Sequence, residues 1–163
     1  VPAYLRGGGQ ERGYRAGTEN VPAIAGFGAA AACAAEDDGH MAALAAWRER
    51  MEAAATARVP EAVVHGAEAP RLPNTSCLGL PGVSAETQVM KLDLAGIAVS
   101  AGSACSSGKV QDSHVLSAMG AREPGSAIRV SLGWNTPEYA LDRFLAVWCD
   151  LAERRRPHRH AAA

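Results

Sequence analysis

The chain has 163 residues, with 16 Lys and Arg against 17 Asp and Glu and a formal net charge of -1 at pH 7. This length is enough for one globular domain with a hydrophobic core, and the near-zero charge gives no basic surface for a phosphate backbone, so we expect no nucleic-acid binding. The longest apolar stretch, the alanine-rich run before Glu36, is interrupted by glycines and too weakly hydrophobic for a membrane span, so we expect no membrane contact.

Two helices are predicted before residue 60. Apolar residues recur at helical spacing from about Glu19 to Glu36, with Thr18 placed to cap the first turn. Asp37, Asp38 and Gly39 end this helix, and a second helix is predicted from His40 to Arg58. The charged residues of the second helix fall on the face opposite its apolar side chains, and we expect them in solvent: Arg48, Glu49, Arg50 and Glu52.

Short strands separated by turns and helices are predicted from residue 62 onward. The strands are expected at 62–65, 75–80, 97–100 and 127–132. Ser84 is placed to cap a helix that ends at Gly96, a short helix is expected at 112–119, and the last helix should begin with Thr136 as its cap and Pro137 as its first residue. This alternation predicts an α/β domain over 39–156, separate from residues 1–38, followed by a disordered tail at 157–163.

The glycine-rich segment Gly7 to Asn20 is the first candidate site. Its glycines allow the backbone to approach an anion closely, Arg12 and Arg15 are suited to carboxylate or phosphate, and Thr18 lies at a predicted helix N-terminus. A flexible linker with two solvated arginines explains the pattern equally well. The match to a dinucleotide-binding fingerprint is poor, because Arg12 stands where the third glycine would be.

The four cysteines form no Cys-x-x-Cys pair and no metal-ligand spacing, which favours a reducing, cytoplasmic setting. Cys105 lies among Gly, Ala and Ser residues at 100–108, where a thiolate nucleophile would have room to move. The alternative is an ordinary turn with a free thiol. Cys33 and Cys149 are expected to be small buried hydrophobic residues of helices, and Cys77 a structural residue of a strand.

Arg129 is the third candidate. Ile128, Val130 and Leu132 take one face of the predicted strand, so Arg129 lies on the other face, where it could bind a substrate carboxylate with two hydrogen bonds. An internal ion pair or a simple exposed arginine is the alternative. The five histidines show no pairing typical of zinc sites or of histidine-activated hydrolysis.

Taken together, in order and spacing, these segments resemble the carboxyl-terminal part of a pyridoxal-phosphate-dependent cysteine desulfurase of the class V aminotransferase superfamily, of the iron–sulfur-cluster or nitrogen-fixation type. The segments that carry the resemblance are GGGQERGYRAGTENVPAIAGFG at 7–28, LPNTSCLGLPGV at 72–83, LDLAGIAVSAGSACSSG at 92–108, SHVLSAMG at 113–120 and AIRVSLGWNTPE at 127–138. The resemblance implies an α/β fold of the fold-type I class. Residues 39–156 would form its small domain, a short mixed sheet with packed helices. Residues 1–38 would be a remnant of the large domain that binds pyridoxal 5'-phosphate (PLP), with the start of the long linking helix.

The resemblance also implies roles for single residues. In this family the substrate cysteine forms an imine with PLP, and a protein thiolate attacks its sulfur, which leaves L-alanine and a persulfide whose sulfur serves iron–sulfur cluster or thio-cofactor biosynthesis. By the motif match the thiolate is Cys105, and Arg129 binds the substrate carboxylate. Thr18 matches the threonine that reaches the cofactor phosphate of the neighbouring subunit, which implies a homodimer, and Arg12 and Arg15 match arginines near that site. The implied partners are L-cysteine and a sulfur-acceptor or scaffold protein.

One part of the family pattern is not found in the chain. The lysine that holds PLP lies in a Ser-x-His-Lys segment upstream of the glycine run, and Lys91 and Lys109 stand in no matching motif. We therefore expect a fragment that lacks PLP and is inactive by itself. Two alternatives stay open: a non-catalytic module that binds a sulfur-transfer partner, and an enzyme similar to selenocysteine lyase.

Overall fold

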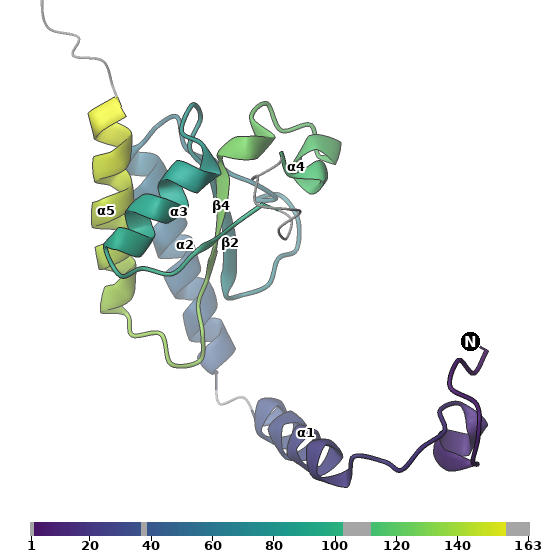
Figure 1. The fold of residues 1–163 in the computed structure, drawn as a ribbon. Helices are drawn as coiled ribbons and strands as arrows, with labels where there is room; N and C mark the ends of the chain where they lie inside the picture. Colours follow the sequence, from purple (N-terminus) through teal and green to yellow (C-terminus); the bar gives the residue numbers. More distant parts are fainter. Residues whose placement is uncertain (1, 37–38, 103–111, 156–163) are drawn as a thin grey trace, which may run out of the picture. The chain divides into compact units, whose positions relative to one another are not determined.

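The computed structural model describes residues 2–36, 39–102 and 112–155. Cys105, Lys109 and the predicted tail at 157–163 lie outside the described residues. The chain divides into two compact units, Val1–Asp38 and Gly39–Ala163, and each is described by itself (Figure 1). None of the helices in the described ranges combines the length and the hydropathy that a membrane crossing requires.

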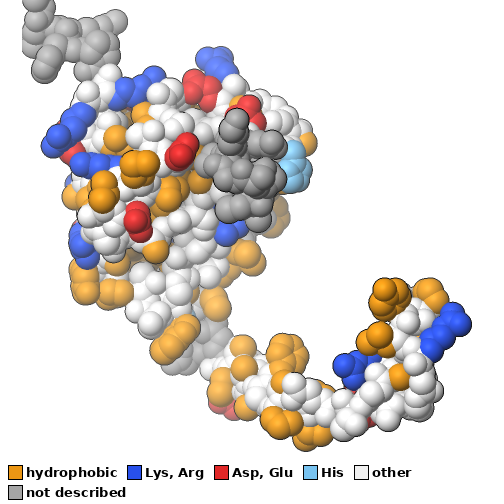
Figure 2. Space-filling view, viewed as in Figure 1, with side chains coloured by type: hydrophobic (Ala, Val, Ile, Leu, Met, Phe, Trp, Pro, Cys, Tyr) orange, Lys and Arg blue, Asp and Glu red, His pale blue; other side chains and the backbone are white. Residues whose placement is uncertain are grey.

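The first unit contains a short 3-10 helix η1, Gln10–Gly13, and the helix α1, Val21–Ala35. The cap of α1 is Asn20, whose side-chain oxygen accepts a hydrogen bond from the Ala23 amide at 3.2 Å. The prediction that Thr18 caps this helix was therefore wrong. None of the residues of α1 is buried, and orange apolar side chains line it in Figure 2. Cys33 is exposed, contrary to prediction, because residues 2–36 contain no second layer to pack against it.

The second unit is built on a four-stranded sheet. Its strands are β1 (Val63–Val64), β2 (Thr75–Gly79), β3 (Ser100–Ala101) and β4 (Ala127–Ser131). They lie in the order β1-β2-β4-β3, and all three pairs are antiparallel, so the sheet in the described residues is not the mixed sheet that was expected. Strand β4 is central and pairs with β2 on one side and β3 on the other. The order brings together strands that are far apart in the sequence.

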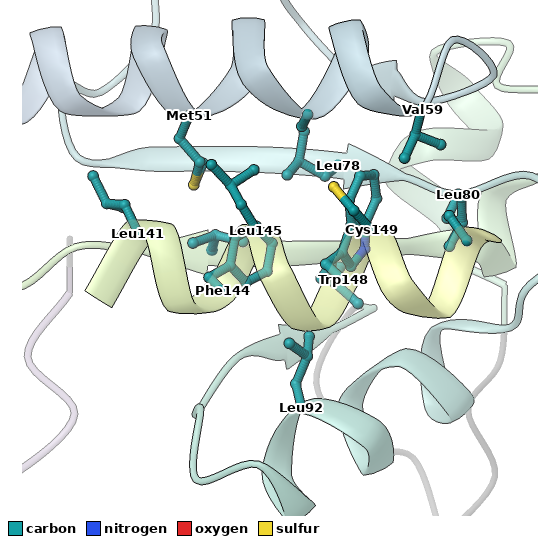
Figure 3. Close-up of a cluster of buried hydrophobic side chains, with 14 of the residues drawn as sticks. Met51, Val59, Leu78, Leu80, Leu92, Leu141, Phe144, Leu145, Trp148 and Cys149 are labelled. Atoms are coloured by element: carbon teal, nitrogen blue, oxygen red, sulfur yellow. The ribbon is translucent and has the colours of Figure 1, made fainter. Parts of the chain in front are cut away.

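Three helices pack with one face of this sheet: α2 (His40–Arg58), α3 (Ala85–Leu94) and α5 (Tyr139–Arg155). The residues buried between the helices and the sheet form one core, in which Trp148 is fully buried (Figure 3). Its indole Nε1 donates to Gln88 Oε1 at 2.9 Å, and the Gln88 amide nitrogen donates to the carbonyl of Ser126 at 2.6 Å. These bonds satisfy the indole N–H of Trp148 and the side-chain amide of Gln88 inside the core.

The charged face of α2 is not wholly in solvent as predicted. Arg48 and Glu52 are buried, because the segment before β2 passes over them. Arg71 of that segment donates to Glu52 through both terminal nitrogens, at 2.6 and 3.0 Å, and Arg48 donates to the carbonyl of Leu72 at 2.6 Å. Burial by itself would raise the pKa of Glu52, but the hydrogen bonds and positive charge of Arg71 outweigh it and lower that pKa.

Caps and turns set the remaining helix boundaries. Ser84 caps α3 as predicted, with its hydroxyl accepting from the Thr87 amide at 3.2 Å. The short helix α4, His114–Ala118, lies within the predicted 112–119. The last helix begins later than predicted, at Tyr139, because the Thr136 hydroxyl accepts from the Gly133 amide at 2.8 Å and closes a turn instead of capping a helix.

Candidate functional site

Arg129 lies in a row of three side chains on the face of the sheet that α2, α3 and α5 leave uncovered. We call this side the open face. In the strand register Arg129 lies opposite Cys77 on β2 and opposite Ser100 on β3. Its sequence neighbours Ile128 and Val130 point into the core, so the alternation of the strand turns Arg129 outward. The prediction that Arg129 lies on the face opposite Ile128 and Val130 was therefore correct. Strand pairing also places Cys77 and Ser100 on either side of it.

The Arg129 guanidinium has a neutral hydrogen-bond partner and no neutralising charge in the part of the chain that the structure describes. Its Nη2 donates to the hydroxyl of Ser100 at 3.3 Å. None of the described carboxylates forms an ion pair with it. The predicted alternative of an internal ion pair is therefore not seen among these residues. A guanidinium with free donors is suited to hold a carboxylate in two parallel hydrogen bonds.

Cys77, which was expected to be structural, is the second member of the row. It is half-buried, and burial raises the pKa of its thiol, while the positive charge of Arg129 acts in the opposite direction. The sequence pattern indicated which strand carries Cys77 but not its neighbour, because pairing between β2 and β4 is a property of the sheet. Cys149 is buried in the core as predicted, and burial raises the pKa of its thiol as well.

A cavity of about 820 Å³ lies beside the edge strand β1. His65 lines it, and its imidazole Nε2 would lie 2.8 Å from a Cβ placed on Gly79, so a glycine at this position leaves room for the ring. Burial lowers the pKa of His65. A glycine inside a predicted strand is an indication of such a close approach, so this position of His65 could have been found from the sequence. Glu61, Glu68, Glu123 and Arg122 also line the cavity.

In the first unit Thr18 and Arg15 lie together. The Arg15 guanidinium donates to the carbonyls of Gly17 at 3.3 Å and Thr18 at 3.4 Å. Arg12, earlier in the same segment, has a backbone φ of 56°, a left-handed conformation that is uncommon for residues other than glycine. No carboxylate in the described ranges pairs with Arg12 or Arg15. Guanidinium groups without a carboxylate partner among the described residues fit the chemistry of a phosphate.

The two groups of candidate residues lie in different units, and the thiol of Cys105 is outside the described residues. Lys91 is on α3, in the helical layer, whereas Arg129 is on the open face of the sheet. The described residues therefore offer donors that suit the phosphate of PLP but no amine beside Arg129 to bind its aldehyde. They also contain no group of His, Cys, Asp or Glu that could hold a metal ion.

The aminotransferase class-V family model matches residues 5–144 of the chain. A cysteine desulfurase of Cereibacter sphaeroides is 47% identical over 145 residues, which are 88% of this chain and 37% of that protein. The corresponding protein of Sinorhizobium fredii is 43% identical over 148 residues, 89% of this chain and 38% of its own length. The chain thus spans less than two fifths of the length of these two relatives.

Solved structures show the same similarity. A NifS-like protein from Rickettsia africae superimposes with a TM-score of 0.79 at 31% identity, over 93% of this chain and 40% of that one. DndA from Streptomyces lividans gives a TM-score of 0.57 at 34% identity, over 79% of this chain and 36% of that one. These similarities agree with the predicted small domain of a fold-type I enzyme.

Proposed function

Because the chain belongs to the class-V aminotransferase family, we propose that it is the carboxyl-terminal part of a PLP-dependent cysteine desulfurase. The intact enzyme would convert L-cysteine to L-alanine and carry the sulfur as a persulfide on Cys105. The observation that carries the proposal is Arg129, a cation without a carboxylate partner among the described residues, on the open face of the sheet. It lies beside β3, the strand that leads into the Cys105 segment.

Arg129 would bind the carboxylate of L-cysteine. Two hydrogen bonds from a planar guanidinium fix both the position and the orientation of an amino acid. The Ser100 hydroxyl engages one N–H of Nη2, which leaves other donors of the guanidinium for the substrate. Binding through the carboxylate leaves the amino group and the thiol of the substrate free to react.

Cys105 would act as the nucleophile. Its thiolate attacks the sulfur of the bound substrate, a bond forms between the two sulfurs, and the carbon–sulfur bond of the substrate breaks. The electron pair of that bond stays with the substrate carbon, which takes up a proton to give L-alanine. The persulfide on Cys105 then passes its terminal sulfur to an acceptor thiol.

Thr18, with Arg12 and Arg15, would hold the phosphate of PLP. PLP, when bound, supplies the electron sink for the negative charge that develops on the substrate. By the resemblance to the family, the Thr18 hydroxyl would reach the cofactor phosphate of the neighbouring subunit, so the active enzyme would be a homodimer. Lys91 is on the wrong side of the sheet to hold PLP beside Arg129, and the chain by itself should be inactive.

The sulfur would serve iron–sulfur cluster assembly or the synthesis of a thio-cofactor, through an acceptor or scaffold protein in the cytoplasm. Small residues surround Cys105 in the sequence, as suits a thiol that delivers sulfur to a second protein. Selenocysteine is the competing substrate to exclude, because the same carboxylate clamp would bind it.

The test is a chimera in which this chain replaces the matched segment of the Cereibacter sphaeroides relative. We expect the chimera, supplied with PLP, to release L-alanine from L-cysteine, and the 163-residue chain alone to release none. Cys105→Ser should abolish the release. Arg129→Gln should raise KM about 10- to 100-fold, the loss expected for hydrogen bonds to a charged group.

Cys33→Ser is the matched control, because Cys33 is an exposed thiol on α1 and should leave the rate unchanged. Alanine release by the chain alone, or undiminished release by the Cys105→Ser chimera, would refute the proposal. A chimera that acts on L-selenocysteine and not on L-cysteine would identify the lyase instead. A chimera that binds PLP but consumes neither substrate would favour the non-catalytic module.

A further inference from the structure

The hydroxyl of Ser100 is the described hydrogen-bond partner of the Arg129 guanidinium, at 3.3 Å from Nη2. Ser100 begins β3, where the register sets it opposite Arg129. The bond therefore links two strands across the open face of the sheet. Ser100 is half-buried and Arg129 is exposed, so a fixed group holds the end of a long, mobile side chain.

The nature of this partner matters for the charge of Arg129. A carboxylate in the place of Ser100 would hold the guanidinium but would also neutralise it and occupy its donors. A hydroxyl accepts one hydrogen bond and leaves the positive charge intact. It also reduces the number of orientations that the guanidinium samples, so less conformational entropy is lost when a ligand binds.

The other neighbour of Arg129 does not compete for it. Cys77 lies opposite Arg129 on β2 and is half-buried. Burial raises the pKa of its thiol, so the group stays protonated and uncharged at neutral pH. The guanidinium thus has a neutral acceptor on the β3 side and a neutral thiol on the β2 side.

We propose that Ser100 is a positioning residue for Arg129, whose hydroxyl holds the guanidinium with its remaining N–H donors free for a carboxylate. Ser100 acts through Arg129 and need not touch the ligand. This inference rests on the proposed role of Arg129 as the carboxylate-binding residue. It adds the residue that sets the geometry of that clamp.

The test is a titration of the 163-residue chain with acetate, in which NMR monitors the chemical shifts of the backbone amides of Cys77 and Arg129. Acetamide, which has the same shape without the charge, is the control ligand. We expect Ser100→Ala to weaken acetate binding about threefold, the cost of freezing one released side chain. Ser100→Thr keeps the hydroxyl and should restore the affinity, whereas the isosteric Ser100→Val should not.

Ser131 provides the matched control. It is a serine on the same side of β4 as Arg129, two residues further along, and lies opposite Thr75. Ser131→Ala should bind acetate like the unmodified chain. A structural disturbance would alter Thr and Val variants alike, so the difference between these two isolates the hydroxyl.

Two results would overturn the inference in different ways. If Arg129→Gln abolishes acetate binding but Ser100→Ala and Ser100→Val leave it unchanged, Arg129 binds carboxylates without help from Ser100. If Arg129→Gln also leaves acetate binding unchanged, the carboxylate-binding role of Arg129 itself fails. Threefold weakening in Ser100→Ala with recovery in Ser100→Thr supports the inference.

Discussion

Replacing Arg129 by glutamine should remove a preference of the Cys77 thiol for negatively charged alkylating reagents. Iodoacetate carries a carboxylate and iodoacetamide does not, although both alkylate thiolates at the same atom. Cys77 lies opposite Arg129 in the register of β2 and β4, so a carboxylate that approaches the thiol also approaches the guanidinium. The comparison therefore measures the carboxylate affinity of Arg129 in the chain as it stands.

The size of the effect follows from Coulomb's law. Adjacent strands are about 4.8 Å apart, and we take about 6 Å between the guanidinium and the carboxylate of the attacking reagent. Two unit charges at about 6 Å in water attract by about 0.7 kcal/mol, which is about a threefold gain in rate. The solvent exposure of Arg129 favours this aqueous value over the larger values for buried charges.

The assay is peptide mass spectrometry after timed alkylation with each reagent. The rate ratio of iodoacetate to iodoacetamide at Cys77 is divided by the same ratio at Cys33, an exposed thiol of the other unit. This quotient cancels the intrinsic reactivity of the reagents and the thiolate fraction of each cysteine. We expect about 3 in the unmodified chain and about 1 in Arg129→Gln. A quotient of 1 in the unmodified chain, or the same value in both proteins, would refute the reasoning.

Three further predictions concern the stability of the second unit and the cavity beside β1. Glu52→Gln should lower the free energy of unfolding by about 2 kcal/mol in urea titrations, because it leaves the Arg71 guanidinium without its counter-charge. The pKa of Glu52 is lowered from 4.5 in the folded state, so this stabilisation is present above pH 4.5 and is lost as the pH falls through the lowered value. If the free energies of unfolding of Glu52→Gln and the unmodified chain still differ by the same amount at low pH, this explanation is contradicted. Trp148→Ala should cost about 4 kcal/mol, since it empties a fully buried site, and a loss under 1 kcal/mol would show that the core is not packed as described. Gly79→Ala should push the His65 imidazole out of its buried position and raise its pKa toward the ordinary 6.5 in an NMR titration, whereas an unshifted pKa would show that the ring does not lie over Gly79.

The periodicity of the sequence was sufficient to place most of the helices and strands. Helix α2 begins and ends at the predicted residues, His40 and Arg58, because its apolar spacing is regular and a glycine precedes it. The Ser84 cap was also visible, since a hydroxyl side chain followed by a helical pattern satisfies the free amides of a first turn. Thr136 has the same local pattern, but its hydroxyl bonds to the Gly133 amide in a turn.

Predictions of burial failed where they depended on long-range packing. Arg48 and Glu52 have the spacing of a solvated face, and only the return of the chain at Arg71 covers them. The prediction for Cys33 fails in the opposite sense: its alanine-rich surroundings indicate a core, but the described part of its unit holds no second layer. Local patterns show which residues share a face, whereas burial depends on what packs against that face.

The candidate site was predictable only in part for the same reason. Alternation along one strand was enough to turn Arg129 away from the core. Its neighbours Cys77 and Ser100 follow from strand order and register, which a single sequence does not encode locally. The positions of Cys105 and the roles of Thr18, Arg12 and Arg15 stay predictions.

The central place of β4 has a consequence for the order in which the molecule acquires its binding properties. Ser100 precedes Arg129 by 29 residues in the sequence, and Cys77 precedes it by 129 minus 77, or 52, residues. Contacts between residues so distant in sequence form late in folding, because the loops between them must close first. A partly folded chain could hold α2 and α5 as helices while the row on the open face is still unformed. During refolding, carboxylate binding would then appear later than the helical circular-dichroism signal. Its appearance would report that the sheet is complete.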